Sequence, residues 1–253
     1  MRLEVFIEAC HAALLSEDTC AVKARDYLIS ERGIRMDTIQ RFKIGYCNDT
    51  QELPDTEPPH GRMLHNKIIV PVWSDFGEVV GCGARIPDKA EKGWVNNTGW
   101  TKGKHLFLLN VAREAIFDAN KAYLFEGYTD GIVAHQEGLP NAVSELGTAL
   151  GLRLIGLLKR YTNRVCVCLD TDKESLSGQV AQAKQLLSLS EACFEELYSI
   201  QMPEGVDPDE FILKNGLRAF YEMERPVGKS DLKTCAEFIE SVKEKRKRER
   251  KRK

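Results

Sequence analysis

The stretch from Lys121 to Asn215 constrains the fold most, because short apolar runs alternate there with amphipathic segments. The pattern predicts strands at 122–125, 141–144, 165–169 and 196–200, with helices between them at 129–137, 150–160 and 176–189. Strand–helix–strand units in series favour a parallel sheet with helices on both faces. We therefore expect an α/β, Rossmann-like domain with a central parallel sheet in this half of the chain.

Acidic residues follow two of these strands at the point where each ends. Glu126 comes after the first strand, and Asp170 and Asp172 come after the third. Ligands of open parallel sheets bind beyond the carboxyl ends of the strands, so these side chains are expected to converge. Crowded carboxylates repel one another unless a cation neutralises them, and oxygen ligands suit Mg²⁺ or Mn²⁺. The alternative is that Asp170 and Asp172 are loop acids that cap the next helix.

A third acidic element follows the fourth strand. Asp207 and Asp209 flank Pro208, so two acids again stand two residues apart. The alternative is that Asp207 is an ordinary cap before a helix that starts with proline.

The N-terminal half has a different pattern. Residues 1 to about 48 carry apolar positions at helical spacing and are expected to be helical, whereas 49–60 is polar with three prolines and predicts a loop. Two β-branched runs within 67–85 flank an Asp/Gly turn and predict a hairpin. An aromatic and basic stretch, 94–104, follows. We expect an α+β basic subdomain here.

The eight cysteines are compatible with disulfides, zinc sites or reduced thiols. None forms a Cys-x-x-Cys pair, and Cys166 and Cys168 lie inside an apolar run. Scattered cysteines on apolar faces of a chain this long are usually reduced core residues of a cytoplasmic protein. Apolar runs stay well below the about 18 residues of a membrane span. We expect a cytoplasmic protein without zinc in this chain.

Charge is distributed unevenly along the chain. Residues 242–253 hold nine Lys/Arg and two Glu, which gives this segment a charge of +7. Because the whole chain has a net charge of −2, the other 241 residues carry −9. A run of this kind is typical of a disordered arm that attracts polyanions, and nucleic acid is the partner it favours. The alternative is a solubilising tail without a specific role.

Four motifs together resemble the TOPRIM domain, and more narrowly the catalytic core of bacterial and phage DnaG-type primases. They are Glu126-Gly127-Tyr128-Thr129-Asp130, Leu146-Gly147-Thr148-Ala149-Leu150, Asp170-Thr171-Asp172 and Asp207-Pro208-Asp209. Arg32-Gly33 resembles the start of the same core, and Gly81-Cys82-Gly83-Ala84-Arg85 and Lys102-Gly103-Lys104 resemble its basic subdomain. The resemblance spans roughly 1–220. It implies a basic subdomain at 1–118, a TOPRIM domain at 119–220, and a helical extension with a basic tail at 221–253.

The resemblance also implies roles and partners. Glu126, Asp170 and Asp172 would be the catalytic acids, and Asp130, Asp207 and Asp209 would complete a cluster that holds two or more Mg²⁺ or Mn²⁺ ions. Contacts to template, primer or nucleotide are implied for Arg85, Lys92, Asn96, Lys102 and Lys104. The implied activity is RNA primer synthesis on single-stranded DNA from ribonucleoside triphosphates. Whether Glu126 is a general base or only a ligand stays open, and a strand-end surface arginine is the alternative for Arg85.

Departures from the family leave other functions open. No zinc ribbon precedes the core and no helicase-binding domain follows residue 220, so a separately encoded zinc module and a replicative helicase are expected partners. The segment 173–178 is longer than the turn that normally follows the Asp-x-Asp acids. The alternatives are a TOPRIM nuclease, which would not need the basic subdomain, and a non-catalytic replisome subunit that binds single strands.

Overall fold

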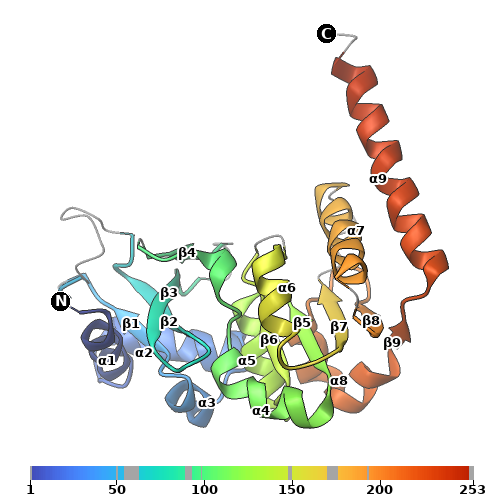
Figure 1. The fold of residues 1–253 in the computed structure, drawn as a ribbon. Helices are drawn as coiled ribbons and strands as arrows, with labels where there is room; N and C mark the ends of the chain where they lie inside the picture. Colours follow the sequence, from blue (N-terminus) through green and yellow to red (C-terminus); the bar gives the residue numbers. More distant parts are fainter. Residues whose placement is uncertain are drawn as a thin grey trace.

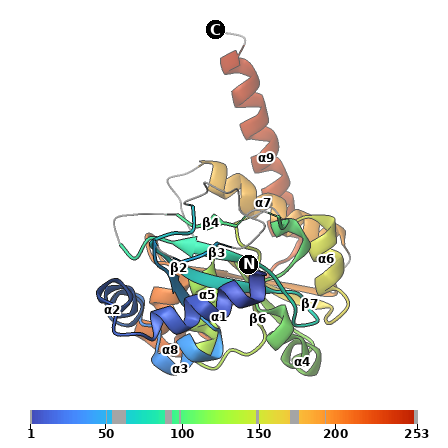
Figure 2. The same ribbon diagram turned by 90° about the vertical axis from the view of Figure 1, so that its left-hand side faces the viewer.

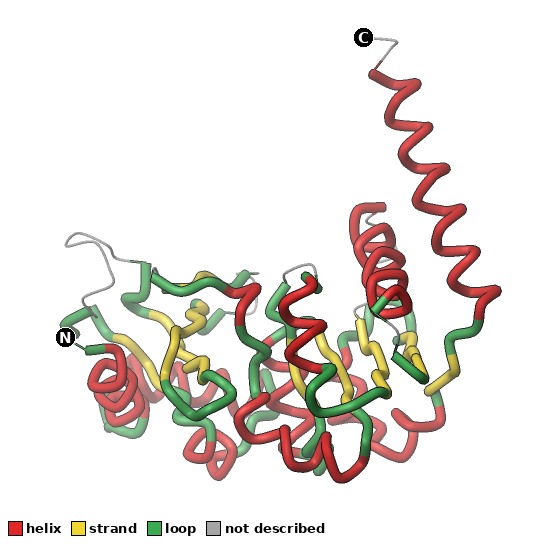
Figure 3. Tube along the Cα trace, viewed as in Figure 1, coloured by secondary structure: helices red, strands yellow, loops and turns green. Residues whose placement is uncertain are grey.

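Two β-sheets lie beside each other, with helices around them and one long helix projecting from the body (Figures 1 and 2). This arrangement comes from a computed structural model, which describes residues 2–49, 51–53, 63–88, 93–97, 99–147, 150–169, 176–192 and 194–250. Figure 3 shows that strands occupy the middle of both halves and that helices flank them.

The N-terminal half combines helices with a four-stranded antiparallel sheet of order β1-β2-β3-β4. Its elements are α1 (Leu3–Leu14), α2 (Thr19–Asp26), the π-helical turn η1 (Tyr27–Glu31), α3 (Met36–Arg41), β1 (Gly45–Cys47), β2 (Lys67–Trp73), β3 (Val79–Arg85), β4 (Val95–Asn96) and the 3₁₀ turn η2 (Lys102–Lys104). The expected hairpin is confirmed as β2 and β3, joined by a turn in which Gly77 has a φ of 87°. Glycine adopts such an angle without a steric cost.

The expectation that residues 1 to about 48 are helical is wrong at its end, because β1 is a strand. Gly45, Tyr46 and Cys47 pair antiparallel with Ile69, Ile68 and Lys67. All three β1 residues are buried. Pairing with a distant strand therefore overrides a local pattern that is compatible with a helix.

The second sheet has the order β6-β5-β7-β8-β9. Its half comprises α4 (Leu109–Ala119), β5 (Ala122–Phe125), α5 (Tyr128–Gln136), β6 (Ala142–Ser144), α6 (Leu152–Leu158), β7 (Arg164–Leu169), α7 (Leu176–Glu191), β8 (Glu196–Gln201), α8 (Pro208–Glu222), β9 (Glu224–Pro226) and α9 (Lys229–Arg250). The four expected strands are parallel to one another, which confirms the predicted sheet. Strand β9 was not predicted and adds an antiparallel edge beside β8.

Helices cover both faces of this sheet because its central strands are apolar on both sides. Leu124 and Val167 point to a core completed by α4, α6 and α7. Phe125 and Cys168 point to a core completed by α5, α8 and the N-terminal helices. Because the second core includes β2 residues such as Ile68, the two sheets share one hydrophobic interior. Helix α4 packs in the first of these cores, although almost all of it lies before the expected domain boundary at 118/119. The expected domain boundaries stay a prediction.

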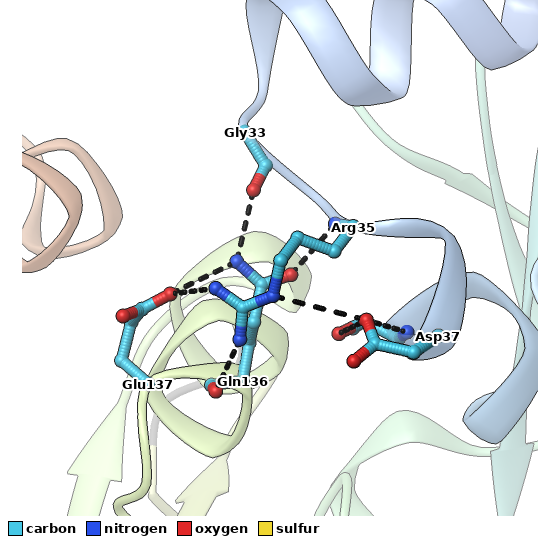
Figure 4. A network of polar contacts seen from close by, with 6 residues as sticks. Gly33, Arg35, Asp37, Gln136 and Glu137 are labelled. Carbon is cyan, nitrogen blue, oxygen red and sulfur yellow. Dashed lines mark hydrogen bonds and ion pairs between the residues drawn. The ribbon is translucent and has the colours of Figure 1, made fainter.

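Polar contacts also join the two halves, as Figure 4 shows around Arg35. The Arg35 guanidinium donates to Glu137 Oε1 at 2.6 Å and to the Gln136 carbonyl at 2.7 Å, at the end of α5. The Gln136 side chain donates to the Gly33 carbonyl and accepts from the Arg35 backbone N–H. These bonds fix the segment before α3 against α5.

The basic C-terminal run is helical where it is described, which corrects the expectation of a disordered arm. Helix α9 continues to Arg250, and residues 251–253 lie outside the described residues. Lysine, arginine and glutamate are strong helix formers, and a helix that is already nucleated by packing propagates at little cost.

The cysteines agree mostly with the expectation of reduced core residues. Five of them, Cys10, Cys47, Cys82, Cys166 and Cys168, are free and buried. Cys20 is exposed and is thus an exception, and Cys193 lies outside the described residues. None of the helices in the described part of the chain is long and apolar enough to cross a membrane.

Candidate active site

The strand ends bring two glutamates side by side. In the parallel pairing of β5 with β6, Phe125 lies opposite Ser144. Glu126 and Glu145 are the next residues on the two strands, and the Glu145 N–H donates to the Phe125 carbonyl at 3.0 Å. Both acids therefore lie at the carboxyl edge of the sheet, where ligands of parallel sheets bind.

Glu145 is the more enclosed of the pair, with an exposed fraction of 6%. Burial and, after it, the negative charge of Glu126 raise the pKa of its carboxyl to about 8. Gln185 of α7 donates to Glu145 Oε2 at 2.9 Å. The edge of the sheet thus holds more negative charge than it can keep ionised without a cation.

Asp130 and Asp209 hold the first turns of α5 and α8 together. Asp130 Oδ2 accepts from the Gly127 N–H at 3.0 Å, which caps α5, and its Oδ1 accepts from the Asp209 N–H at 3.4 Å. Asp209 is 2% exposed and forms an ion pair with Arg32 at 2.8 Å. Arg32 also donates to Thr129 Oγ1 at 2.9 Å. Carboxylates at helix N-termini are favoured by the helix dipole, so these acids support the site whether or not they bind metal.

Asp207 stands at the N-cap of α8, with Pro208 at the first helical position. Its side chain makes no capping hydrogen bond. Asp207 thus occupies the N-cap position that the alternative requires, without a side-chain capping bond, and its role as a ligand stays a prediction.

An aromatic stack connects the antiparallel sheet β1–β4, here termed the basic sheet, to the edge of the parallel sheet that carries the acids. Tyr128, at the start of α5, donates to Asn96 Oδ1 at 2.7 Å and packs on Trp94 with ring centroids 4.4 Å apart. The Arg85 guanidinium lies 6.0 Å from the Trp94 ring. Since Tyr128 follows Glu126 by two residues, Arg85 and Asn96 approach the site from the other half of the molecule.

Arg85 also lines a pocket between the halves with Tyr27 and Arg32. Buried polar atoms without a hydrogen-bond partner face this region, namely the hydroxyl of Tyr27 and the Nε atoms of Arg32 and Arg85. Arg85 is thus half-buried at this pocket, with its guanidinium near the Trp94 ring. Its role in binding an anion stays a prediction.

Several expected site residues cannot be placed. Asp170, Asp172 and Lys92 lie outside the described residues. Lys102 is in η2, with only its backbone described, and Lys104 is exposed at the end of the same turn. Among the residues that are described, no group of three or more His, Cys, Asp or Glu side chains is placed to hold a metal ion. The predicted ligand set of Glu126, Asp130, Asp170, Asp172, Asp207 and Asp209 therefore stays a prediction. Glu145, which is not part of that set, offers a further oxygen donor beside Glu126 of the kind that Mg²⁺ and Mn²⁺ prefer.

Sequence reasoning missed four residues of this site: Glu145, Tyr128, Trp94 and Arg32. A signal existed for Glu145, because it follows the predicted strand 141–144 directly, as Glu126 follows 122–125. Tyr128 and Arg32 stand inside the motifs that resemble the family, and Trp94 starts the aromatic stretch 94–104, but their roles follow only from their contacts across the two halves.

Residues 123–212 match a family described as Toprim-like. The DNA primase of Clostridium acetobutylicum is 33% identical over 226 residues, covering 79% of this chain and 37% of the relative. That of Aquifex aeolicus is 30% identical over 246 residues, covering 86% and 48%. The chain thus spans less than half the length of these two relatives.

Solved structures resemble the chain over a larger share. The zinc-binding and RNA polymerase domains of Aquifex aeolicus primase match with a TM-score of 0.76 and 26% identity, covering 94% of this chain and 64% of that one. A DnaG primase catalytic domain solved with single-stranded DNA matches with a TM-score of 0.70 and 25% identity, covering 88% and 80%. The fold and the strand-end acids therefore define a protein with a Toprim-like domain. More particularly, the chain belongs with the DnaG-type DNA primases and corresponds to their catalytic core.

Proposed function

We propose that this chain synthesises RNA primers on single-stranded DNA from ribonucleoside triphosphates, in the cytoplasm of a bacterial cell or a phage-infected host. The observation that supports it most is the stack from Arg85 through Trp94 to Tyr128, which joins a basic sheet to the strand end that carries Glu126. Polymerisation requires phosphate-binding groups and metal-binding acids at one place.

The acids and the basic groups have separate tasks in this proposal. Glu126, Asp170 and Asp172 would hold Mg²⁺ or Mn²⁺, and Asp207 would join them as a further ligand. When bound, the ions neutralise the triphosphate and lower the pKa of the attacking 3′-hydroxyl. Arg85, Lys92, Asn96, Lys102 and Lys104 orient the phosphates of template, primer and nucleotide. Glu126 either binds metal or accepts the proton of the hydroxyl.

Two of the acids support the others in this scheme. Asp130 and Asp209 keep the first turns of α5 and α8 aligned, through their bonds to Gly127 and Arg32. Their own direct contact with metal, which the resemblance implies, remains part of the proposal.

The alternative functions differ in their need for the basic sheet. A nuclease would use the same acids and leave Arg85 and Asn96 without a task, and a binding subunit would leave the acids without one. Primer synthesis uses both. A separately encoded zinc module would select the start site, and a replicative helicase would deliver template.

The test is an incubation with single-stranded template, labelled ribonucleotides and Mg²⁺ or Mn²⁺. Short labelled products are expected from the wild-type chain and not from Asp170→Asn/Asp172→Asn. Degraded template without new products would support the nuclease, and DNA binding without either product would support the subunit. A chain that makes primers at defined triplets unaided would remove the need for a zinc module.

A matched substitution separates loss of chemistry from loss of folding. Asp118 lies in α4, outside the site, and its substitution Asp118→Asn removes one acid as well. It is expected to keep primer synthesis. Direct Mn²⁺ titration followed by electron paramagnetic resonance then reports metal binding without activity, and weaker binding is expected only for the Asp170/Asp172 substitutions.

A further inference from the structure

Helix α9 has two parts with different surfaces. Leu232, Cys235, Ile239 and Val242 are spaced three and four residues apart, so they form one stripe along the helix. Leu232 and Cys235 pack against the core beside α7, and Ile239 and Val242 are buried. The stripe anchors the first part of the helix on α7.

The second part has no apolar position with which to continue the stripe. Positions 246 and 249, which would follow Val242 at the same spacing, are arginine and glutamate. From Lys243 to Arg250 the helix carries six Lys/Arg and two Glu. This basic end, residues 243–250, extends about 12 Å at 1.5 Å per residue, and it projects past α7 in both views (Figures 1 and 2).

The sheet topology places the basic end on the side of the active site. Strand β8 is parallel to β7, whereas β9 is antiparallel to β8 and so ends at the opposite edge of the sheet. Helix α7 runs back from the carboxyl edge, and α9 starts from the other edge and runs towards it. The basic end therefore projects on the side of the sheet to which the carboxyl ends of β5 and β7 point, and Figure 1 shows α9 lying alongside α7 and continuing past it.

The charge distribution of the chain makes the position of the basic end important for an approaching polyanion. Without residues 242–253 the chain carries −9, and its strand ends concentrate acids. A polyanion that approaches this edge is repelled, except where cations are presented. A basic helix end that projects on the same side as the acids offers such a place at a distance from them.

We propose that the basic end of α9 is an arm that binds the phosphate backbone of the nucleic acid strand leading into or out of the active site. This rests on the proposed function for the identity of the partner. The arm contributes affinity without sequence specificity, because its contacts are to phosphates. Lys245 and Lys247 are exposed and available for such contacts.

The experiment compares two pairs of lysines on the same helix. Lys245→Gln/Lys247→Gln changes the basic end, and Lys229→Gln/Lys233→Gln removes the same charge at the anchored end, where both lysines are also exposed. Binding of a labelled single-stranded oligonucleotide is followed by fluorescence anisotropy at several salt concentrations, in EDTA. The basic-end pair is expected to reduce the slope of log K against log salt by about 1.4, at roughly 0.7 per neutralised phosphate. The anchored-end pair should leave the slope as it is.

The proposal would be refuted if the two pairs changed the salt slope equally, or if neither pair changed it. So would a change in sedimentation of the DNA-free chain by Lys245→Gln/Lys247→Gln without a change in DNA binding, because the basic end would then contact a second copy. Circular dichroism checks that α9 stays helical. If the chain shows the expected difference in salt slope but makes no primers, the proposed function is refuted and the proposal that the basic end binds phosphates is supported.

Discussion

At the scale of single residues, charge burial distinguishes acids that the sequence presents as equivalent. Burial raises the pKa of the Glu145 carboxyl, whereas Asp209 is almost fully enclosed in an ion pair with Arg32. Each arrangement leads to a measurable difference in stability.

Glu145 is expected to make the metal-free chain less stable as pH rises. Its pKa is about 8 in the folded protein against 4.5 as the ordinary value, so the folded state binds the extra proton between these limits. Stability is therefore fullest below pH 4.5 and is lost as pH rises through 8, by on the order of 5 kcal/mol. Urea unfolding in EDTA between pH 5 and 8 should show this slope for the wild-type chain and a flatter one for Glu145→Gln. Parallel slopes for the two chains would contradict it.

The ion pair of Arg32 with Asp209 is expected to matter far more than that of Arg35 with Glu137. The side chains of the first pair are 12% and 2% exposed, and those of the second 52% and 28%. Arg32→Ala leaves a buried carboxylate unpaired and should cost about 3–5 kcal/mol of unfolding free energy. Arg35→Ala should cost about 1 kcal/mol or less from its ion pair.

A double substitution tests the reason for that difference. Arg32→Ala/Asp209→Asn leaves no charge unpaired, so it should be more stable than Arg32→Ala alone in denaturant titrations. If the double variant is as unstable as the single one, packing of Arg32 and not its charge is responsible.

At the scale of elements, the close approach of β3 to α5 fixes how the basic sheet meets the acids. A Cβ atom at Gly83 would lie 2.5 Å from Tyr128 Cζ, and Tyr128 is 1% exposed and has no room to move. Glycine at this position is thus required by a neighbour and not by its own backbone angle.

Gly83→Ala is expected to destabilise the chain by about 1–3 kcal/mol, because an added methyl group forces the packed tyrosine out of place. Gly156→Ala is the matched control, since no heavy atom lies within 4 Å of its Cβ position in α6. Alanine favours helices over glycine, so the control should be up to about 1 kcal/mol more stable than the wild-type chain. Thermal unfolding followed by circular dichroism compares the two, and a neutral Gly83→Ala would refute the close contact.

At the scale of the whole molecule, the shared hydrophobic interior couples the two halves. Tyr46 and Ile68 from the first half belong to the same core as Phe125 and Ile132 from the second. A core that crosses the boundary favours one cooperative transition over two.

The tryptophans allow this coupling to be measured. All three, Trp73, Trp94 and Trp100, lie in the N-terminal half, whereas far-ultraviolet circular dichroism reports helices throughout. The midpoints of urea unfolding by the two signals are expected to coincide. Separate midpoints would mean that the halves unfold independently.

The sequence determined the repeating strand–helix pattern, the parallel sheet and the placement of Glu126 at a strand end, because these depend on local periodicity. It also indicated the family through motifs in a fixed order. The tertiary structure alone decided that β1 is a strand, that Glu145 is enclosed, and that Asp130 and Asp209 brace two helices. It also directed α9 towards the active-site edge. These features arise from contacts between residues far apart in the chain, and no local pattern encodes such contacts.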